Sequence, residues 1–485
     1  MGDSLTTGRR LSAGAAWSYG SVLLTAVLQF SYAAGTSRLL GATAFGDYAI
    51  ALVVGALVSV LATGGFSQAV GRMESVDSER LSTQFAFALL FGAVGAVVLV
   101  ATSPATSLLW RTPSAQPAIA VMGASALVAP LFALLTGLER REGRFARLSV
   151  VILSCNVLGF ISGIVAVLQW RESWTLIVSP VVAMLGPVIF FTFSNRRWTL
   201  TRASLVPRLG KIGELRFGSQ VTVSRLLSFL NWNIGRYAVT IVGGAAALGF
   251  WNRADTLTGV PFAQAQGVVT QTVYPEFRHD ISSPERARRV WPDLLGLAAW
   301  GYWPCAALIA VFGPPALTVL LGSAWGEAAN IIPVLAILGG MQGVLVLLGS
   351  AIEALGRFRL IWLAQLVFFS LQLASAALTF ATGRWVFILY GLVATVAIQH
   401  LLHIWALGRS GHLDVTKLSK NYLYAAIAAI LTGLISLGVV TAWQRLDLPV
   451  AATVSVALIG LPAILGWKAR NILPPVQIAR RYGIF

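Results

Sequence analysis

The chain has 485 residues, of which 57% are hydrophobic and only 11% are charged. Soluble globular proteins carry about 25% charged residues, so this composition excludes an ordinary soluble protein. Apolar runs long enough to cross a bilayer, which takes ~20 residues each, recur from Leu11 to Trp467. Crossings and short connections fill the whole length and leave no room for a separate soluble domain.

The formal net charge of +17 and the pI near 10.8 would suit nucleic-acid binding by their size alone. The basic residues, however, lie mainly in short connections between apolar runs, as in the cytoplasmic loops of membrane proteins. We therefore predict the lipid bilayer as a partner and no nucleic acid. The cysteines lie in apolar segments and the histidines are scattered, so we expect no metal site and no cofactor.

The apolar runs predict an all-α membrane protein with about fourteen transmembrane helices. They lie at residues 11–34, 44–68, 83–103, 116–138, 148–170, 174–194, 217–242, 246–273, 292–313, 329–350, 360–381, 385–407, 421–443 and 449–467. With the N-terminus in the cytoplasm, nearly all Arg and Lys outside the helices fall in cytoplasmic connections. The exceptions on the outer side are Arg38, Arg111, Arg171, Arg384 and Arg445. This asymmetry predicts cytoplasmic N- and C-termini.

Two pairs of stretches in the chain resemble each other. Residues 41–51 read GATAFGDYAIA and residues 244–254 read GAAALGFWNRA, while Gly-Arg-Phe occurs at 143–145 and again at 356–358. They predict two six-helix repeats of the same orientation, related by a pseudo-two-fold axis along the membrane normal, with an appended helix pair. The expected domains are an N-terminal lobe (1–195), a cytoplasmic amphipathic linker (196–216), a C-terminal lobe (217–410) and the extra helices with the tail (411–485). Paired repeats of this kind are typical of transporters.

The predicted seventh helix carries two arginines inside an apolar segment. Arg225 and Arg236 are eleven residues apart, so they return to within ~20° of the same face about 16 Å further along. Ser228 and Trp232 fall between them. A central Arg costs at least ~2.5–3.5 kcal/mol in a membrane and usually faces a cavity or a partner. The guanidinium fork fits phosphate oxygens, which predicts a cationic substrate cavity; the alternative is that both arginines reach the membrane surfaces.

The predicted eighth helix continues this polar surface. Arg253 and Gln264 share one face, and both are candidates for the cavity lining. Asp255 is either an ion-coupling carboxylate or the counter-ion of Arg236 or Arg253. Pro261 removes a backbone hydrogen bond, so we expect a bend that is either a hinge or a fixed structural feature.

The first helix has a polar face at helical spacing, formed by Ser18, Ser21, Thr25, Gln29 and Tyr32. Such a face suits a water-filled lumen, where Thr25 and Gln29 would line the cavity. Packing against another helix through small polar residues is the alternative.

The outer mouth of the predicted path carries two charged residues of opposite sign. Arg38 follows the first helix and Asp47 lies near the start of the second. These two side chains are candidates for an ion pair, and Asp47 is also a candidate for ion coupling.

Several motifs together resemble the Wzx-type polysaccharide flippases, in the superfamily that also holds multidrug-and-toxin extruders and the lipid II flippase. These motifs are Arg38–Gly41 with Phe45–Ala49, Leu230–Asp255 with its Asn231, Asn233, Gly249 and Trp251, Tyr274–Phe277, Leu320–Trp325 and Glu353–Arg357. Family members often carry an acidic residue after the paired Asn, where this chain has Arg236. The acidic-plus-basic chemistry of that helix is therefore altered here.

The resemblance implies a flippase that moves polyprenyl-pyrophosphate-linked oligosaccharide from the cytoplasmic to the outer leaflet of the bacterial plasma membrane. It would work by alternating access through a cavity lined by the first, second, seventh and eighth helices. Envelope glycosyltransferases are candidate partners at the 196–216 linker. The glycan, the lipid length and the coupling ion are left open by the sequence.

Three other functions compete with this one. A lipid II-type peptidoglycan precursor flippase shares the helix number and charge. A drug or metabolite:cation antiporter of the same superfamily would need acidic cavity residues. A membrane-embedded glycan polymerase or transferase would need a large extracytoplasmic loop with acidic pairs, and the short connections favour a transporter over an enzyme.

Overall fold

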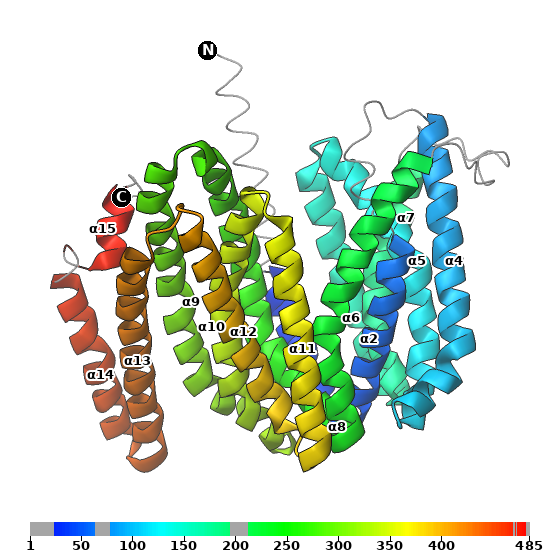
Figure 1. Cartoon of the computed structure of the whole chain (residues 1–485). Helices are drawn as coiled ribbons and strands as arrows, with labels where there is room; N and C mark the ends of the chain where they lie inside the picture. Colours follow the sequence, from blue (N-terminus) through cyan, green and yellow to red (C-terminus); the bar gives the residue numbers. More distant parts are fainter. Residues whose placement is uncertain (1–23, 64–77, 195–211, 469–470, 472, 482–485) are drawn as a thin grey trace. The chain divides into compact units, whose positions relative to one another are not determined.

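The computed structural model describes residues 24–63, 78–194, 212–468, 471 and 473–481. Within these ranges the chain forms α-helices, short 3-10 helices and turns, with no strand (Figure 1). It packs as two compact units, Met1–Asn252 and Arg253–Phe485. Most of the predicted amphipathic linker at 196–216 lies outside the described residues.

The first described element of the first unit is a helix at residues 24–39, and the unit ends inside a long helical segment. Its further elements are α2 (Ala42–Thr63), α4 (Ser78–Leu109), η1 (Pro113–Ala115), α5 (Gln116–Arg141), α6 (Phe145–Trp170), η2 (Ser173–Ile177), α7 (Val178–Ser194) and the first part of α8 (Ile212–His279). Within α8 the helical backbone is broken at Gly244, which has φ +75° and ψ 178°. Glycine adopts this backbone without steric strain, so the break separates the predicted seventh and eighth helices.

The second unit holds the rest of α8 and the C-terminal helices. These are η4 (Asp280–Ser282), α9 (Pro284–Leu321), η5 (Ser323–Trp325), α10 (Gly326–Ala354), α11 (Phe358–Thr382), α12 (Val386–Arg409), α13 (Val415–Arg445), α14 (Leu448–Lys468) and α15 (Pro474–Arg481). The last of them, α15, is a short helix that the hydropathy of the sequence did not predict.

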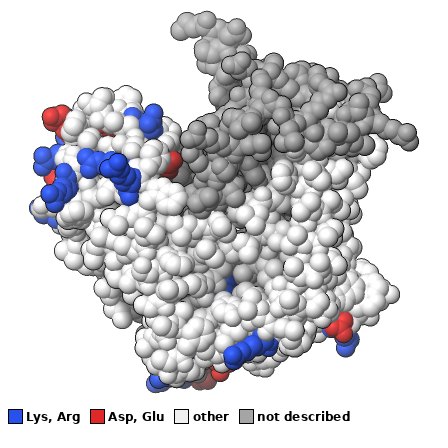
Figure 2. All heavy atoms as spheres, turned by 45° about the vertical axis from the view of Figure 1, so that its right-hand side comes forward, with Lys and Arg blue, Asp and Glu red and all other residues white. Residues whose placement is uncertain are grey.

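Every predicted transmembrane helix has a counterpart among the described residues. Eleven helices are long and apolar enough to cross a membrane, and one of these, residues 226–267, contains the Gly244 break. The helix at 24–39 and α14 complete the set. In the view of Figure 2, most of the visible Lys, Arg, Asp and Glu lie at the upper left and along the lower edge, and most of the remaining coloured surface is formed by other residues. The predicted all-α membrane fold is confirmed.

Two helices occupy equivalent central places in their own units. In the first unit, 61% of the apolar stretch of the helix Pro113–Arg141 is buried, against 28% of the apolar stretch of α6. In the second unit, 61% of the apolar stretch of the helix Ser323–Ala354 is buried, against 22% of the apolar stretch of α11. The fourth helix of each predicted repeat therefore forms the centre of its unit, and the fifth faces outward.

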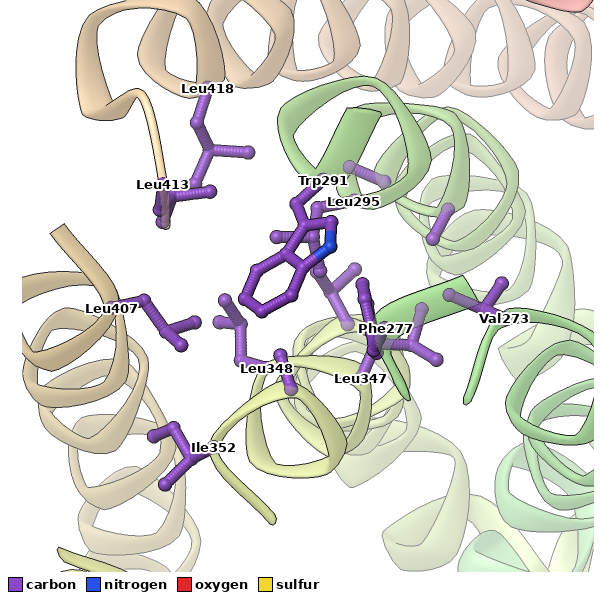
Figure 3. Packing of buried hydrophobic residues seen from close by; sticks show 14 of the residues in the cluster. Val273, Phe277, Trp291, Leu295, Leu347, Leu348, Ile352, Leu407, Leu413 and Leu418 are labelled. Carbon is purple, nitrogen blue, oxygen red and sulfur yellow. The ribbon is translucent and has the colours of Figure 1, made fainter. Parts of the chain in front are cut away.

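The hydrophobic core of the second unit gathers around Trp291 at the start of α9 (Figure 3). Its indole meets Phe277 of α8 edge-on, with ring centroids 5.1 Å apart. Leu347 and Leu348 of α10 lie on one side, and Leu407 of α12 is part of the same cluster. This cluster joins one end of α8, α9, α10 and α12.

The backbone supports the predicted repeat at three helix connections. A residue with positive φ follows the third helix at Arg111 (52°) and Gly322 (102°). Another follows the fourth helix at Gly143 (70°) and Gly356 (67°), and a third follows the fifth helix at Arg171 (54°) and Gly383 (68°). Left-handed residues are uncommon outside helix ends and turns, so their recurrence at near-constant offset reflects a common chain path in the two units.

The appended helix α13 is joined to other helices of the second unit by polar contacts. Asn421 donates from Nδ2 to the carbonyl of Pro292 in α9 (2.9 Å), and Tyr422 Oη lies 3.0 Å from Nε2 of His400 in α12. Trp443 then donates from Nε1 to Ser455 Oγ of α14 (2.8 Å). Interhelical hydrogen bonds of this kind fix the packing of membrane helices.

Candidate functional site

The residues of the polar face predicted on the first helix differ in burial and in contacts. Thr25 is half-buried and Gln29 is exposed within the first unit. Tyr32 instead packs on α6, where its ring stacks on Phe160 with centroids 5.2 Å apart and its hydroxyl fills the space beside Gly163. Tyr32 is therefore a packing residue, whereas the cavity role of Gln29 stays a prediction. Ser18 and Ser21 lie outside the described residues.

Arg38 at the end of the first helix and Asp47 in the second turn of α2, the two charged residues of the predicted outer mouth, have different surroundings. Arg38 is exposed, whereas Asp47 is 4% exposed. Ser114 of η1 donates its hydroxyl to Asp47 Oδ1 at 3.0 Å. Hydrogen bonds to a buried carboxylate satisfy its lone pairs, so Asp47 joins α2 to the segment that leads into α5.

The first part of α8 carries the predicted arginine stripe. Ser228 is half-buried and Trp232 is 37% exposed within the first unit. Arg236 is half-buried and donates from Nη1 to Asn233 Oδ1, one turn earlier, at 3.4 Å. The side chain of Arg225 lies outside what the structure describes.

Tyr237 fixes the rotation of this helix against the first unit. Its hydroxyl donates to the carbonyl of Leu109 at 3.3 Å, and its ring meets Trp110 edge-on at 5.1 Å between centroids. Phe229 packs on the same hydrophobic cluster. The aromatic pair thus directs one face of the helix inward and leaves Trp232 on another, partly open face.

The second part of α8 places a guanidinium inside a membrane-spanning helix. Arg253 is only 7% exposed, while Asp255 and Gln264 are half-buried. Helical backbone angles continue through Pro261, and the break of the α8 segment is at Gly244. A buried Arg needs compensating partners, which marks this position as a functional candidate. The hinge role of Pro261 stays a prediction.

A buried carboxylate in the first part of α9 was not predicted from the sequence. Asp293 is 1% exposed and forms ion pairs with Lys417 of α13 (2.8 Å) and Arg481 of α15 (2.7 Å). The only local signal is an acidic residue that follows Pro292 at the edge of an apolar run. Its partners lie more than a hundred residues away, so the sequence pattern gives no indication of the pairing.

Metal ligands do not gather anywhere in the part of the chain that the structure describes: no three His, Cys, Asp or Glu side chains lie close enough to hold an ion. The candidate chemistry of the described site is therefore that of arginine, tryptophan and amide side chains. Such groups bind phosphate oxygens and sugar hydroxyls.

Residues 36–330 match the protein family described as "Polysaccharide biosynthesis protein". The chain is 21% identical to the teichuronic acid biosynthesis protein TuaB of Bacillus subtilis (strain 168), over 89% of each chain. It is also 21% identical to the lipopolysaccharide biosynthesis protein WzxC of Escherichia coli (strain K12), over 71% of this chain and 70% of that one.

Among solved structures, the fold is similar to that of the lipid II flippase MurJ in an inward closed conformation. The TM-score is 0.68 at 11% identity, and the match covers 95% of this chain and 99% of that chain. At this identity the likeness concerns the fold alone. Together with the apolar helices, it defines a multi-pass, all-α membrane protein with the fold of that flippase.

The matched family spans more than half of the sequence. The chain belongs to this polysaccharide biosynthesis family, and its predicted resemblance to the Wzx-type flippases is confirmed.

Proposed function

We propose that the protein moves a polyprenyl-pyrophosphate-linked oligosaccharide from the cytoplasmic to the outer leaflet of a bacterial plasma membrane. The observation that carries this proposal is Arg253, a guanidinium only 7% exposed within a membrane-spanning helix of a polysaccharide biosynthesis protein. Intramembrane arginines are rare and commonly mark substrate pathways. In this proposal the guanidinium binds the pyrophosphate head group.

In this proposal Arg225, Arg236 and Arg253 replace the water around the pyrophosphate. Their planar donor forks match phosphate oxygens in pairs, which a point charge does not. Trp232 offers a ring surface to sugars, and Gln29 and Gln264 offer amide donors and acceptors to hydroxyls. The polyprenyl chain stays in the lipid throughout.

The transport cycle in this proposal is alternating access between the two six-helix lobes, residues 1–195 and 217–410, with both termini in the cytoplasm. Outward movement of a negatively charged head group is favoured by an inside-negative potential, by ~2.3 kcal/mol per charge per 100 mV. Asp255 serves either as the counter-ion of an arginine or as an ion-coupling group. Glycosyltransferases that build the substrate are the proposed partners.

The names of the relatives support the proposed substrate class. Their names place them in the biosynthesis of teichuronic acid and of lipopolysaccharide. From these names we infer only that this chain handles a glycan precursor.

The test is export of a surface glycan by cells that lack this protein and carry a plasmid copy of it. We expect Arg225→Ala, Arg236→Ala and Arg253→Ala each to lower export about tenfold, because a hydrogen bond to a charged group contributes ~1.5–3 kcal/mol. Lipid-linked oligosaccharide should then accumulate in the inner leaflet. Export at the normal rate in all three variants would refute the site.

Matched controls separate charge from geometry and from folding. Arg→Lys at each position keeps the charge and loses the fork, so an intermediate rate is expected. Arg384→Ala removes an exposed arginine from a connection and should leave export unchanged. Loss of peptidoglycan synthesis instead of one glycan would favour the lipid II alternative, and new glycan products made by the purified protein would favour a polymerase or transferase.

A further inference from the structure

The start of α2 and the start of the second part of α8 make direct backbone contact inside the first unit. A Cβ atom added to Gly46 would lie 1.9 Å from the carbonyl oxygen of Ala245. One added to Gly249 would lie 1.9 Å from the carbonyl oxygen of Ala42. Real Cβ atoms do not approach other heavy atoms within 3.0 Å, and a backbone oxygen cannot swing aside. Only glycine fits at either position.

These four residues are equivalent pairs of the sequence repeat. Gly46 corresponds to Gly249 and Ala42 to Ala245 when GATAFGDYAIA is laid on GAAALGFWNRA. The glycine of each copy meets the alanine carbonyl of the other copy. Such reciprocal contacts are what two segments related by a two-fold axis produce. We call this contact the glycine crossing.

The sequence of the glycine crossing suits close approach in a membrane. Each copy reads Ala-x-x-x-Gly, the small-xxx-small pattern that lets membrane helices come together and make Cα–H···O contacts. Glycine is a poor helix former, and two of them one turn inside a helix need a packing reason. Phe45 and Leu248, which precede the glycine in each copy, are both 1% exposed. The crossing is therefore dry as well as close.

The glycine crossing lies at one end of the two helices that contain it. Ala42 is the first residue of α2, and Ala245 directly follows the break at Gly244. In the predicted topology both helix starts face the outside of the cell. The same two helices, the second and the eighth, line the path of the proposed transport.

We propose that the glycine crossing closes the outer end of the transport path and has to separate once in each cycle. This assignment rests on the proposed function, because a closure matters only if a substrate leaves on that side. Closure by backbone contact at two glycines leaves no room for a side chain. Any larger residue there shifts the protein toward the open arrangement.

The test measures how accessible the glycine crossing is from outside the cell. A single cysteine replaces Ala245, which is 8% exposed, in a chain where Cys155 and Cys305 are alanine. Its reaction with a membrane-impermeant maleimide is followed on intact cells. We expect Gly46→Leu to raise the labelling rate about tenfold, because the bulky residue shifts the population from closed to open. Glycan export should fall in parallel.

Two matched variants make the result specific. Gly41→Leu adds the same side chain just before α2, where a Cβ meets nothing within 4 Å, and should change neither labelling nor export. Ala42→Gly combined with Gly249→Leu should fail to restore export, because the obstacle is the main-chain oxygen of residue 42. Restoration by this pair would show an ordinary side-chain contact and overturn the proposal.

Unchanged labelling in a stably inserted Gly46→Leu protein would also overturn it. If that variant does not accumulate in the membrane, Gly46→Ala, which meets the same oxygen, replaces it. A rise in labelling seen only in inside-out vesicles would refute the outer location. The labelling reaction needs no substrate, so it tests the closure independently of the arginine site. If Gly46→Leu raises labelling while the three arginine variants export glycan normally, the closure stands and the arginine site is refuted.

Discussion

The connection between α5 and α6 has the same backbone conformation as the connection between α10 and α11, but different side-chain interactions stabilise the two. In the first, Gly143 donates to the carbonyl of Arg140 (3.1 Å) and Arg144 to that of Glu139 (3.0 Å). In the second, Gly356 donates to Glu353 (2.9 Å) and Arg357 to Ile352 (3.3 Å). Every donor and acceptor is displaced by the same number of residues, so the two turns are the same structure.

The side chains at one equivalent position differ completely. Glu139 is 0% exposed and is held by Arg144 (3.6 Å) and Arg147 (3.7 Å). Its counterpart Ile352 is 1% exposed and belongs to the hydrophobic cluster around Trp291 (Figure 3). Arg147 also contacts Ser194 and the ring of Phe191 on α7.

The comparison teaches that the path of the chain and the chemistry that stabilises it are separable. A left-handed glycine fixes the turn in both units, because it ends one helix and redirects the chain at little steric cost. What fills the space below the turn is either an ion cluster or apolar contact. Buried ion pairs and well-packed apolar residues of similar volume often stabilise a fold to a similar extent.

The largest effect should come from removing the cations around the buried carboxylate. Arg144→Ala with Arg147→Ala leaves Glu139 buried without the two ion pairs, and we expect the free energy of unfolding to fall by about 3–5 kcal/mol. Unfolding in mixed micelles measures it. Arg140→Ala, an exposed arginine one turn earlier, should cost less than about 0.5 kcal/mol. Equal losses in the two variants would contradict the role of the cluster.

A smaller loss of stability, of the same size in both units, is expected when the glycine of each turn is replaced. Gly143→Ala and Gly356→Ala force a side chain into left-handed backbone, which costs about 1–2 kcal/mol each. The thermal midpoint of the detergent-solubilised protein should fall by similar amounts in both. Gly349→Ala, in α10 with nothing near its Cβ, should be neutral or stabilising. A loss at only one of the two turns would show that they are not equivalent.

The smallest effect should come from giving the first turn the residues of the second. Glu139→Ile with Arg147→Leu copies Ile352 and Leu360, and we expect a change in stability within about 1 kcal/mol. Each single change should cost more than the pair, because it leaves one partner unmatched. A double variant as unstable as the sum of its parts would show that the ion cluster is indispensable here.

The sequence predicted which residues belong to the candidate site, but it did not predict what their side chains contact. Arg236 and Arg253 were recognisable as charges within apolar runs, because such charges are rare and costly. That Tyr32 packs on α6, while Gln29 on the same helix face stays exposed, was not predictable. Spacing along one helix gives which residues share a face, but it does not give what that face meets.

The sequence by itself determined the membrane-spanning helices, their number and order, and the two repeats. These properties are local: an apolar run of sufficient length has to satisfy its own backbone in lipid, and only a helix does so alone. Tertiary structure decided the glycine crossing of Gly46 and Gly249, the cations around Glu139 and the partners of Asp293. Each joins residues from separate helices, and which helix faces meet depends on the packing of all of them together.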